Sequence, residues 1–546
     1  MNTSRILWSG CVLVVFELAI LVGDCRLEAA PDSSVSASPS AGTAIKELRR
    51  KAAERQRRLI YNNDGGDVIW LTQPTAEALL QRSTTMLVGT QVDNISYCPR
   101  SVGLDSFTYF TKIGTIFTVR EGHYASNQME ALVAKGIDPL RVMVDFGKRE
   151  NKELFYSLRM NDTHDASLQN GHLSLPANRF KAAHPEYMLG TPTKRPKHGA
   201  WTALDYGQPE VRERVFRLFE EACRNYDIDG VELDFFRHPV FFRSTSRGES
   251  VTDEERATMT ELMVRIRKMA DEVGQLRGRP ILISMRVPDS VEYCRAIGLD
   301  LENWMASDLL DIYVPAGYFQ LNDWEYSTAL GHKYGVKVYP SLDDTRIMDV
   351  SVNALRMNNL AYRARAADAW RAGADGIYLF NLPESFRTGT GLIQELGDPT
   401  LLATLDKEYY CSYRGVKNAA GGNLPYGPYL KLETLNPDNP RKIEPGKTAS
   451  ARLSLGENLG RETSANLKLR LKVQGLSDAA GLLVVLNGKS LTMKPGSNAW
   501  FESVLSNSEL RNGSNTIEVS LTSDAKQPAT WSDAVLEVRH AKKRPQ

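Results

Sequence analysis

The stretch that decides the fold reads IDGVELDFFRHP, residues 228–239. Apolar and acidic side chains alternate along its first half, and a period of two predicts a β-strand, which we place over 228–236. Amphipathic helices are predicted on either side of it, over 209–226 and 253–273. A short strand between two helices is the repeating unit of parallel α/β sheets.

Strands and helices keep alternating along most of the chain. Short apolar runs predict further strands at 59–62, 153–160, 281–287, 310–315, 336–342 and 374–379. Apolar residues at helical spacing predict helices at 324–334 and 359–372. Such units predict an α/β chain with a (β/α)8 TIM barrel, and an open doubly wound sheet is the alternative. No GxGxxG stands between a strand and a helix, and no GxxxxGKS/T occurs, so nucleotide binding has no support.

Changes in composition predict the domain boundaries. A basic residue, an apolar run and small residues at 1–30 predict a secretory signal, with a retained membrane anchor as the rival interpretation. Residues 31–57 are a Ser/Ala/Pro-rich linker and a lead-in helix, 58–411 the barrel, and 412–447 a Gly/Asn/Pro-rich linker. From 448 to 541 only short strands with Asn-Gly turns are predicted, which indicates a smaller all-β sandwich. This accessory domain either binds carbohydrate or buttresses the barrel.

Charge and cysteine content exclude several kinds of partner. The chain has 67 basic and 66 acidic residues, and this balance argues against a dedicated nucleic-acid binder. Its later cysteines, Cys98, Cys223, Cys294 and Cys411, are scattered and form no CxxC pair, which argues against a structural zinc site. We expect no cofactor, an exported protein in the periplasm or outside the cell, and membrane contact only if the leader is retained.

Two acids on the central strand are the best candidates for chemistry. Val231, Leu233 and Phe235 share one face, so Glu232 and Asp234 share the other and point into the barrel. Asp234 lies nearer the carboxyl end, where barrel active sites are built. Burying such a pair is costly unless the acids are paired or used. Glu232 would hold a substrate hydroxyl or raise the proton affinity of Asp234; the purely structural alternative pairs both acids with Arg159 or Arg286.

Hydrolysis of a glycosidic bond needs two carboxyl groups on opposite sides of that bond. Glu232 and Asp234 stand on one strand and cannot flank a substrate, so the partner acid is expected from across the mouth. Asp343 or Asp344 is the first choice, and Glu384 or Asp162 the reserve.

Polar and aromatic residues at other strand ends are expected to bind the substrate, because sugar rings stack on aromatic side chains. This predicted set is Arg159, Asn161, Asp162, His164, Trp201, Arg237, His238, Arg286, Tyr318, Trp324, Asn381 and Glu384. Its arginines and His238 hint at an acidic or sulfated sugar, although the same arginines could neutralise the two acids. A metal site is a further hypothesis, with His164, Asp165, Asp234 and His238 as ligands. The spacing of these residues is loose, and no metal is expected.

The segment IDGVELDFFRHP also resembles the fourth-strand signature of glycosyl-hydrolase-like barrels, the family 10-like group. RLIYNNDGGD at 58–67, SLRMNDTHD at 157–165 and GADGIYLFNLP at 373–383 resemble features of exported bacterial proteins of this type. The resemblance spans about residues 55–410 and implies a glycosidase-like barrel in which Asp234 is the catalytic or sugar-contacting acid. The chain departs from the chitinase-like DGxDxDxE pattern, because Phe236 stands in place of its final acid.

The sequence is therefore compatible with three functions. The first is a glycoside hydrolase acting on an extracellular poly- or oligosaccharide, and the second is a non-catalytic carbohydrate-binding barrel. The third is a polysaccharide lyase with His164 or Tyr318 as base and Arg286 neutralising a uronate. A hydrolase requires Asp343, Asp344 or Glu384 to point into the cleft, whereas three outward acids and an Asp234 locked by Arg286 favour binding alone.

Overall fold

The computed structural model describes residues 41–99, 103–166, 178–343, 345–382, 391–414, 424–458, 465–476 and 478–540. The predicted leader lies outside these residues. Within them, none of the helices combines the length and apolar character that a membrane crossing needs. The first element is α1 (Ala41–Ala53), and the four cysteines named above are buried and unbridged.

Nine parallel strands form the main sheet, in the order β10-β11-β1-β2-β5-β6-β7-β8-β9. Their bounds are β1 (Leu59–Asn63), β2 (Val92–Tyr97), β5 (Glu153–Arg159), β6 (Gly230–Asp234), β7 (Leu282–Val287), β8 (Ile312–Pro315), β9 (Lys337–Val338), β10 (Ser341–Leu342) and β11 (Ile377–Leu379). The parallel strands confirm the predicted α/β pattern, but β2 was not predicted, because Asp93 and Asn94 interrupt its apolar run.

The two ends of this order are consecutive in the chain. Only Tyr339 and Pro340 separate β9 from β10, and together they occupy the single strand predicted at 336–342. The backbone N–H of Tyr339 donates to Tyr313 of β8 at 2.9 Å, and that of Tyr378 of β11 donates to Pro340 at 3.0 Å. One segment thus bonds to β8 on one side and to β11 on the other.

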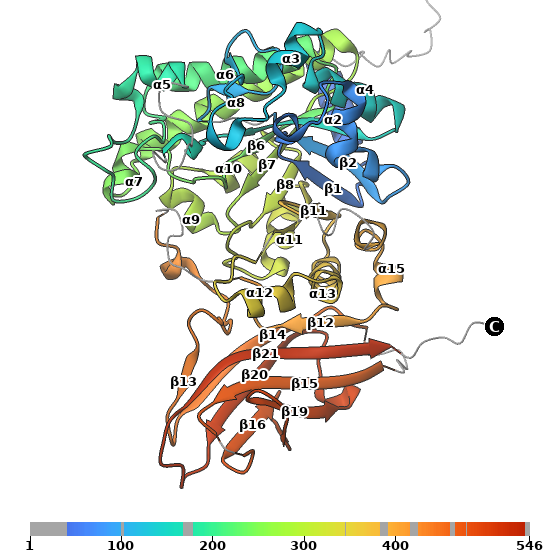
Figure 1. Ribbon diagram of the computed structural model, residues 1–546, viewed down its shortest axis with the longest axis vertical. Helices are drawn as coiled ribbons and strands as arrows, with labels where there is room; N and C mark the ends of the chain where they lie inside the picture. The colour runs from blue at the N-terminus through green and yellow to red at the C-terminus, as the bar shows by residue number, and fades with distance from the viewer. Residues whose placement is uncertain are drawn as a thin grey trace, which may run out of the picture. The chain divides into compact units, whose positions relative to one another are not determined.

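Helices connect the strands (Figure 1). The larger ones are α2 (Ala76–Ser83), α4 (Pro139–Arg149), α6 (Pro209–Asn225), α8 (Asp253–Arg277), α11 (Trp324–Lys333) and α13 (Asn359–Arg371). Shorter ones are α3 (Met129–Ala134), α5 (Arg179–Ala183), α7 (Arg243–Arg247), α9 (Val291–Ala296), α10 (Leu301–Ala306), α12 (Val350–Arg356) and α15 (Pro399–Leu402). The predicted helix at 209–226 matches α6 within one residue, because Pro209 suits a first helical position.

The two faces of the sheet bury different side chains. Val231 and Leu233 of β6 join the large core formed with helices such as α6 and α8. A separate apolar cluster lies on the other face and includes Ile60, Phe155 and Tyr378. Strand alternation therefore separates a helix-packed face from an inner face, and the candidate site is built on the inner one.

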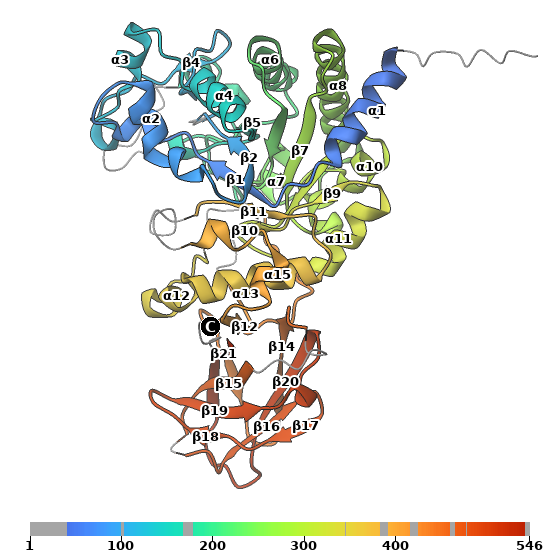
Figure 2. The ribbon, with the colours of Figure 1, turned by 90° about the vertical axis from the view of Figure 1, so that its right-hand side faces the viewer.

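The C-terminal part contains two antiparallel sheets whose inner faces share one apolar core (Figure 2). One has the order β12-β21-β15-β19-β18, with β13 also on β21, and the other β14-β20-β16-β17. Their bounds are β12 (Lys407–Tyr410), β13 (Arg441–Ile443), β14 (Thr448–Leu455), β15 (Ala465–Gln474), β16 (Leu482–Leu486), β17 (Lys489–Leu491), β18 (Lys494–Pro495), β19 (Trp500–Leu505), β20 (Gly513–Leu521) and β21 (Ala529–His540). Asn487 and Gly488, both at positive φ, join β16 to β17 as a two-residue hairpin turn.

Two strands of this part lie outside the predicted domain bounds. β12 belongs to the segment predicted as barrel, and β13 to the segment predicted as linker, yet both pair with β21. These pairings depend on contacts about 90 to 130 residues away along the chain, as the register Tyr410↔Val535 shows, so local composition does not reveal them.

Candidate functional site

Glu232 and Asp234 point to the same, inner side of the sheet, as their alternation predicts. Oε1 of Glu232 accepts hydrogen bonds from Ser157 of β5 at 2.7 Å and from Tyr378 of β11 at 2.9 Å. Asp234 is the last residue of β6, so its carboxylate lies at the carboxyl end of that strand. Both acids therefore lie on the inner face of the sheet, and Asp234 is the one nearer the carboxyl end of the strands.

Arg286 of β7 joins Asp234 to Asp343, which follows β10. Its Nη1 donates to Asp234 Oδ1 at 2.9 Å and its Nη2 to Asp343 Oδ2 at 3.0 Å. All three residues are at most 2% exposed, and the guanidinium carbon lies 3.6 Å from the centre of the Phe380 ring. Burial opposes the charge on Arg286, but the two carboxylates outweigh it and raise the arginine's pKa. One permanent cation thus serves two carboxylates.

Asp234 is also held by the backbone that follows it. Its Oδ1 accepts from the N–H groups of Phe236 at 3.0 Å and Arg237 at 3.1 Å, in addition to Arg286. Among the residues that the structure describes, Oδ2 of Asp234 receives no hydrogen bond. The carboxylate is therefore fixed through one of its two oxygens.

Glu232 lies deeper than Asp234 and is almost fully buried. Burial and the nearby charge of Asp234 together raise the pKa of Glu232 to about 7, and hydrogen bonds such as that from Ser157 offset only part of this rise. Glu232 is consequently about half protonated at neutral pH. Such a group is better suited to supporting the site than to flanking a substrate.

We expect Glu232→Gln to flatten the pH dependence of stability. Because the folded-state pKa of Glu232 is raised, its stabilising contribution is complete below the unfolded value of 4.5 and is lost as the pH rises through about 7. The loss corresponds to about 3 kcal/mol. Glutamine keeps an oxygen to accept from Ser157 and Tyr378 but does not ionise. The free energy of unfolding of the variant should therefore rise relative to that of the wild type between pH 5 and pH 8.

Urea unfolding at pH 5, 6, 7 and 8 measures this difference. Asp289→Asn serves as a comparison, since burial also raises the pKa of Asp289 to about 7. This variant should remove only the part of the pH dependence of stability that Asp289 contributes. Parallel curves for wild type and Glu232→Gln would mean that Glu232 is ionised throughout, against the expectation.

A second polar cluster surrounds Asp162, just after β5. Its carboxylate accepts from Arg159 at 3.0 Å and from Nδ1 of His164 at 2.9 Å. Arg237 donates to Nε2 of His164 at 2.7 Å, and because arginine can only donate, the proton of His164 must be on Nδ1. Burial opposes ionisation of Asp162, but His164, Arg159 and His238 outweigh it and hold its pKa well below the ordinary value.

Within the described residues, this cluster also contains three groups that lie close enough together to be considered as metal ligands. One ligand atom each from Asp162, His164 and His238 lie within 4.8 Å of one another. The guanidinium groups of Arg159 and Arg237 bond directly to two of these residues, which opposes a bound cation. Of the other imagined ligands, Asp165 pairs with Lys181 at 3.0 Å and Asp234 with Arg286. That the protein needs no metal stays a prediction.

Three predicted substrate-binding residues are instead enclosed by protein. Both amide hydrogens of Asn161 bond to backbone oxygens, of Leu204 at 3.1 Å and Val240 at 2.8 Å, so it has no donor left for a substrate. The indole of Trp201 donates to the carbonyl of Ala166 at 3.1 Å, and Trp324 is buried in the core at the start of α11. Their positions stabilise the loops around the site.

Of the remaining predicted residues, two lie at the mouth of the sheet and two lie outside the residues that the structure describes. Tyr318 and Asn381 follow β8 and β11 and are partly exposed. Asp344 and Glu384 lie outside the described residues. Sequence reasoning missed Tyr378 and Phe380, although the inner-face parity of β11 would have found both, and it missed Arg346, for which no local pattern exists.

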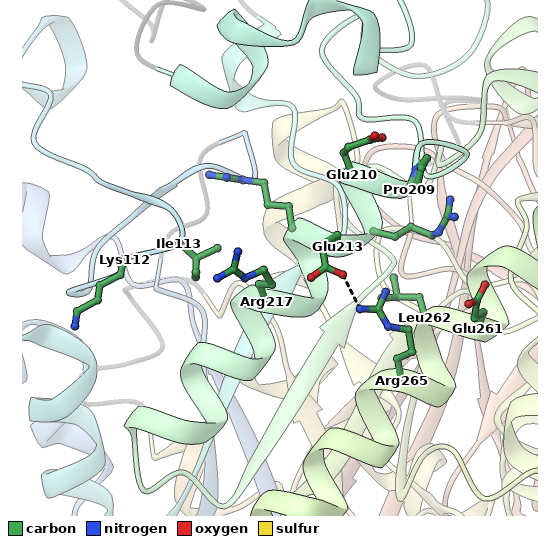
Figure 3. A pocket seen from close by; sticks show the side chains of 11 residues that line it. Lys112, Ile113, Pro209, Glu210, Glu213, Arg217, Glu261, Leu262 and Arg265 are labelled. Atoms are coloured by element: carbon green, nitrogen blue, oxygen red, sulfur yellow. Dashed lines mark hydrogen bonds and ion pairs between the residues drawn. The ribbon is translucent and has the colours of Figure 1, made fainter. Parts of the chain in front are cut away.

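An open pocket lies elsewhere, against the outer surfaces of α6 and α8 (Figure 3). It has a volume of about 680 Å³ and contains none of the predicted site residues. Its lining contains five basic and three acidic side chains, and Arg265 bonds to Glu213 at 2.6 Å. This pocket is an open groove between helices, apart from the candidate site.

Comparisons with known proteins give no family. No family model matches the chain, and no curated protein matches it. Similar solved structures include an alpha-L-fucosidase isoenzyme 2 from Paenibacillus thiaminolyticus, at 11% identity and a TM-score of 0.40, over 63% of this chain and 48% of that one, about half of its length.

Two further similar structures are a maltogenic alpha-amylase from Thermotoga neapolitana and the PgaB glycoside hydrolase domain from Bordetella bronchiseptica. The first has 11% identity and a TM-score of 0.37 over 85% of this chain and 99% of that one. The second has 10% identity and a TM-score of 0.38 over 63% and 98%. Because every one of these TM-scores is below 0.5, the case for a function rests on the geometry of the site itself.

Proposed function

We propose that the protein is an exported glycoside hydrolase that acts on a poly- or oligosaccharide at the carboxyl-terminal mouth of a (β/α)8 barrel. The barrel is supported by the main sheet, in which β9 and β10 count as one strand and bring the total to eight. An open doubly wound sheet would leave two free edges, whereas here the segment from β9 to β10 bonds to both β8 and β11.

The observation that carries the proposal is the convergence of Asp234 and Asp343 on Arg286. Asp343 points inward, as a hydrolase requires, and it comes from a different strand than Asp234. Because they bond to the two terminal nitrogens of one guanidinium, their bonded oxygens lie within roughly 8 Å of each other. This limit admits the carboxylate separations of both retaining and inverting glycosidases.

Each acid has a role that follows from its bonds. Asp234, held through one oxygen, is the nucleophile that attacks the anomeric carbon or the base that takes a proton from water. Asp343 takes up a proton from solvent once its bond to Arg286 is loosened, and donates that proton to the glycosidic oxygen as the glycosidic bond breaks. A carboxyl bonded to a guanidinium is a poor proton donor, so substrate binding has to loosen the bond between Arg286 and Asp343.

The alternative is a carbohydrate-binding barrel without catalysis. It is favoured by the burial of Asp234, Asp343 and Arg286, which satisfy one another's charges in this structure. The contacts of Arg286 with Asp234 and Asp343 also argue against a polysaccharide lyase, because an arginine enclosed by two carboxylates is not free to neutralise a uronate.

A panel of purified polysaccharides tests the proposal, with release of reducing ends as the measurement. Wild type should release products and Asp234→Asn should not. Asp229→Asn is the matched control, because Asp229 precedes the same strand at its opposite end and bonds to the N–H of Leu154 at 2.9 Å. Binding without products would support the alternative, and equal product release by Asp234→Asn would remove Asp234 from the mechanism.

A further inference from the structure

The positive charges predicted at the mouth are not equivalent in the structure. Arg159 pairs with Asp64 at 2.9 Å and with Asp162, and Arg286 pairs with Asp234 and Asp343. Arg237 differs from both, because no carboxylate of the described residues lies within ion-pair distance of it. The mouth therefore contains a guanidinium whose charge is not matched by an acid in the described part of the chain.

The surroundings of Arg237 add to this imbalance. Within the described residues its side chain makes one hydrogen bond, to His164, and its Nε is buried without a partner there. Burial, together with the neighbouring charges of Arg159 and Arg346, lowers the pKa of Arg237 to about 10, and the more distant carboxylates of Asp64 and Asp162 offset this only in part. A bound anion would relieve both effects, since it would supply an acceptor and an opposite charge.

Tyr318 supplies a second unused group beside Arg237. The guanidinium carbon of Arg237 lies 5.2 Å from the centre of the Tyr318 ring, and that of Arg346 lies 3.7 Å from it. The Tyr318 hydroxyl is buried and has no hydrogen-bond partner among the described residues. A buried hydroxyl without a partner is costly, which indicates a place where a ligand completes the bond.

His238 supplies a third donor, beside the His164 ring to which Arg237 bonds. Its Nδ1 accepts from the N–H of Thr163 at 3.3 Å, so the ring proton is on Nε2. Burial, together with the charge of Arg237, lowers the pKa of His238 well below its usual value and keeps the ring neutral. Its ring centre is 5.2 Å from that of His164, the residue to which Arg237 bonds.

We infer that Arg237, Tyr318 and His238 form a subsite for an anionic substituent of the sugar, a carboxylate or a sulfate ester. The inference rests on the proposed function, because it takes the mouth to be the carbohydrate site. Three hydrogen-bond donors with excess positive charge fit an acceptor-only group that carries negative charge. A neutral sugar hydroxyl would leave that charge uncompensated.

Isothermal titration with matched pairs of polysaccharides tests the subsite. Polygalacturonate is compared with its fully methyl-esterified form, and dextran sulfate with dextran, so each pair differs in charge on one backbone. Arg237→Gln should weaken binding of the preferred charged polymer at least about tenfold and leave the neutral polymer unchanged. The pair that responds identifies carboxylate or sulfate as the group recognised.

Two variants keep the result interpretable. Arg265→Gln removes one positive charge from the groove on α6 and α8, so it corrects for general attraction of polyanions and should change nothing. Tyr318→Phe removes only the unpartnered hydroxyl and should weaken the same charged polymer at least threefold, whether or not Arg237→Gln folds well.

The outcomes separate this inference from the proposed function. Equal loss for charged and neutral polymers, or equal effects of Arg237→Gln and Arg265→Gln, would overturn the subsite. Hydrolysis of a neutral glycan that depends on Asp234 but not on Arg237 would overturn the subsite while the hydrolase stands. Binding of an acidic glycan that depends on Arg237, without any product, would support the subsite while the hydrolase fails.

Discussion

Arg286→Met is expected to lower the free energy of unfolding by about 3–5 kcal/mol, the range found when one partner of a buried ion pair is removed. The side chain is fully buried and its two terminal nitrogens bond to Asp234 and Asp343. Methionine fills much of the volume but leaves two carboxylates without their shared cation. Urea unfolding followed by tryptophan fluorescence measures the loss.

Two comparisons show whether charge or packing causes this loss. Arg265→Gln breaks an ion pair with Glu213 at the surface and should cost no more than about 1 kcal/mol. Adding Asp343→Asn to Arg286→Met removes one of the stranded charges and should recover part of the stability. An Arg286→Met protein as stable as wild type would show that the two carboxylates are not ionised together beside Arg286.

Asp234→Asn is expected to reduce kcat by about a thousandfold on any polysaccharide that the wild type hydrolyses, within the range typical of a lost catalytic acid or base. Asparagine keeps an oxygen to accept from Phe236, Arg237 and Arg286, so the loop after β6 should keep its shape. The amide lacks the negative charge needed to attack the anomeric carbon or to take a proton from water. Steady-state kinetics with purified oligosaccharides measures the change.

The division of this effect between kcat and KM is informative. A loss confined to kcat, with KM nearly unchanged, indicates an interaction made in the transition state. If KM rises while kcat stays constant, Asp234 only binds the sugar, and the carbohydrate-binding alternative gains. Asp229→Asn should leave both constants at wild-type values.

Most of the parallel sheet could be predicted from local pattern. The segments around β6, β7 and α8 have strong periodicity, and their predicted bounds agree with the structure within a few residues. Prediction failed for β12 and β13, which within the described part of the chain pair with β21, far along the sequence. Isolated short strands acquire their structure from distant partners, so the local sequence contains little information about them.

The candidate site was predicted unevenly for a similar reason. The choice of Asp343 as an inward acid agrees with its contact to Arg286, whereas Asn161 and Trp201 turned out to bond to backbone groups of neighbouring loops. Polar residues at strand ends have the same local signature whether they face a substrate or support a loop. Only the folded chain distinguishes these two uses.

From the sequence by itself it follows that Glu232 and Asp234 share a face, because the alternation of side chains along a strand is a local property of the backbone. The tertiary structure alone decides which arginines form ion pairs with which carboxylates. Arg286 bonds to carboxylates 52 and 57 residues away along the chain, whereas Arg237 bonds to His164 and has no carboxylate within ion-pair distance among the described residues. The physical reason is that ion pairing depends on distance in space, which is set when separate strands come together in one sheet.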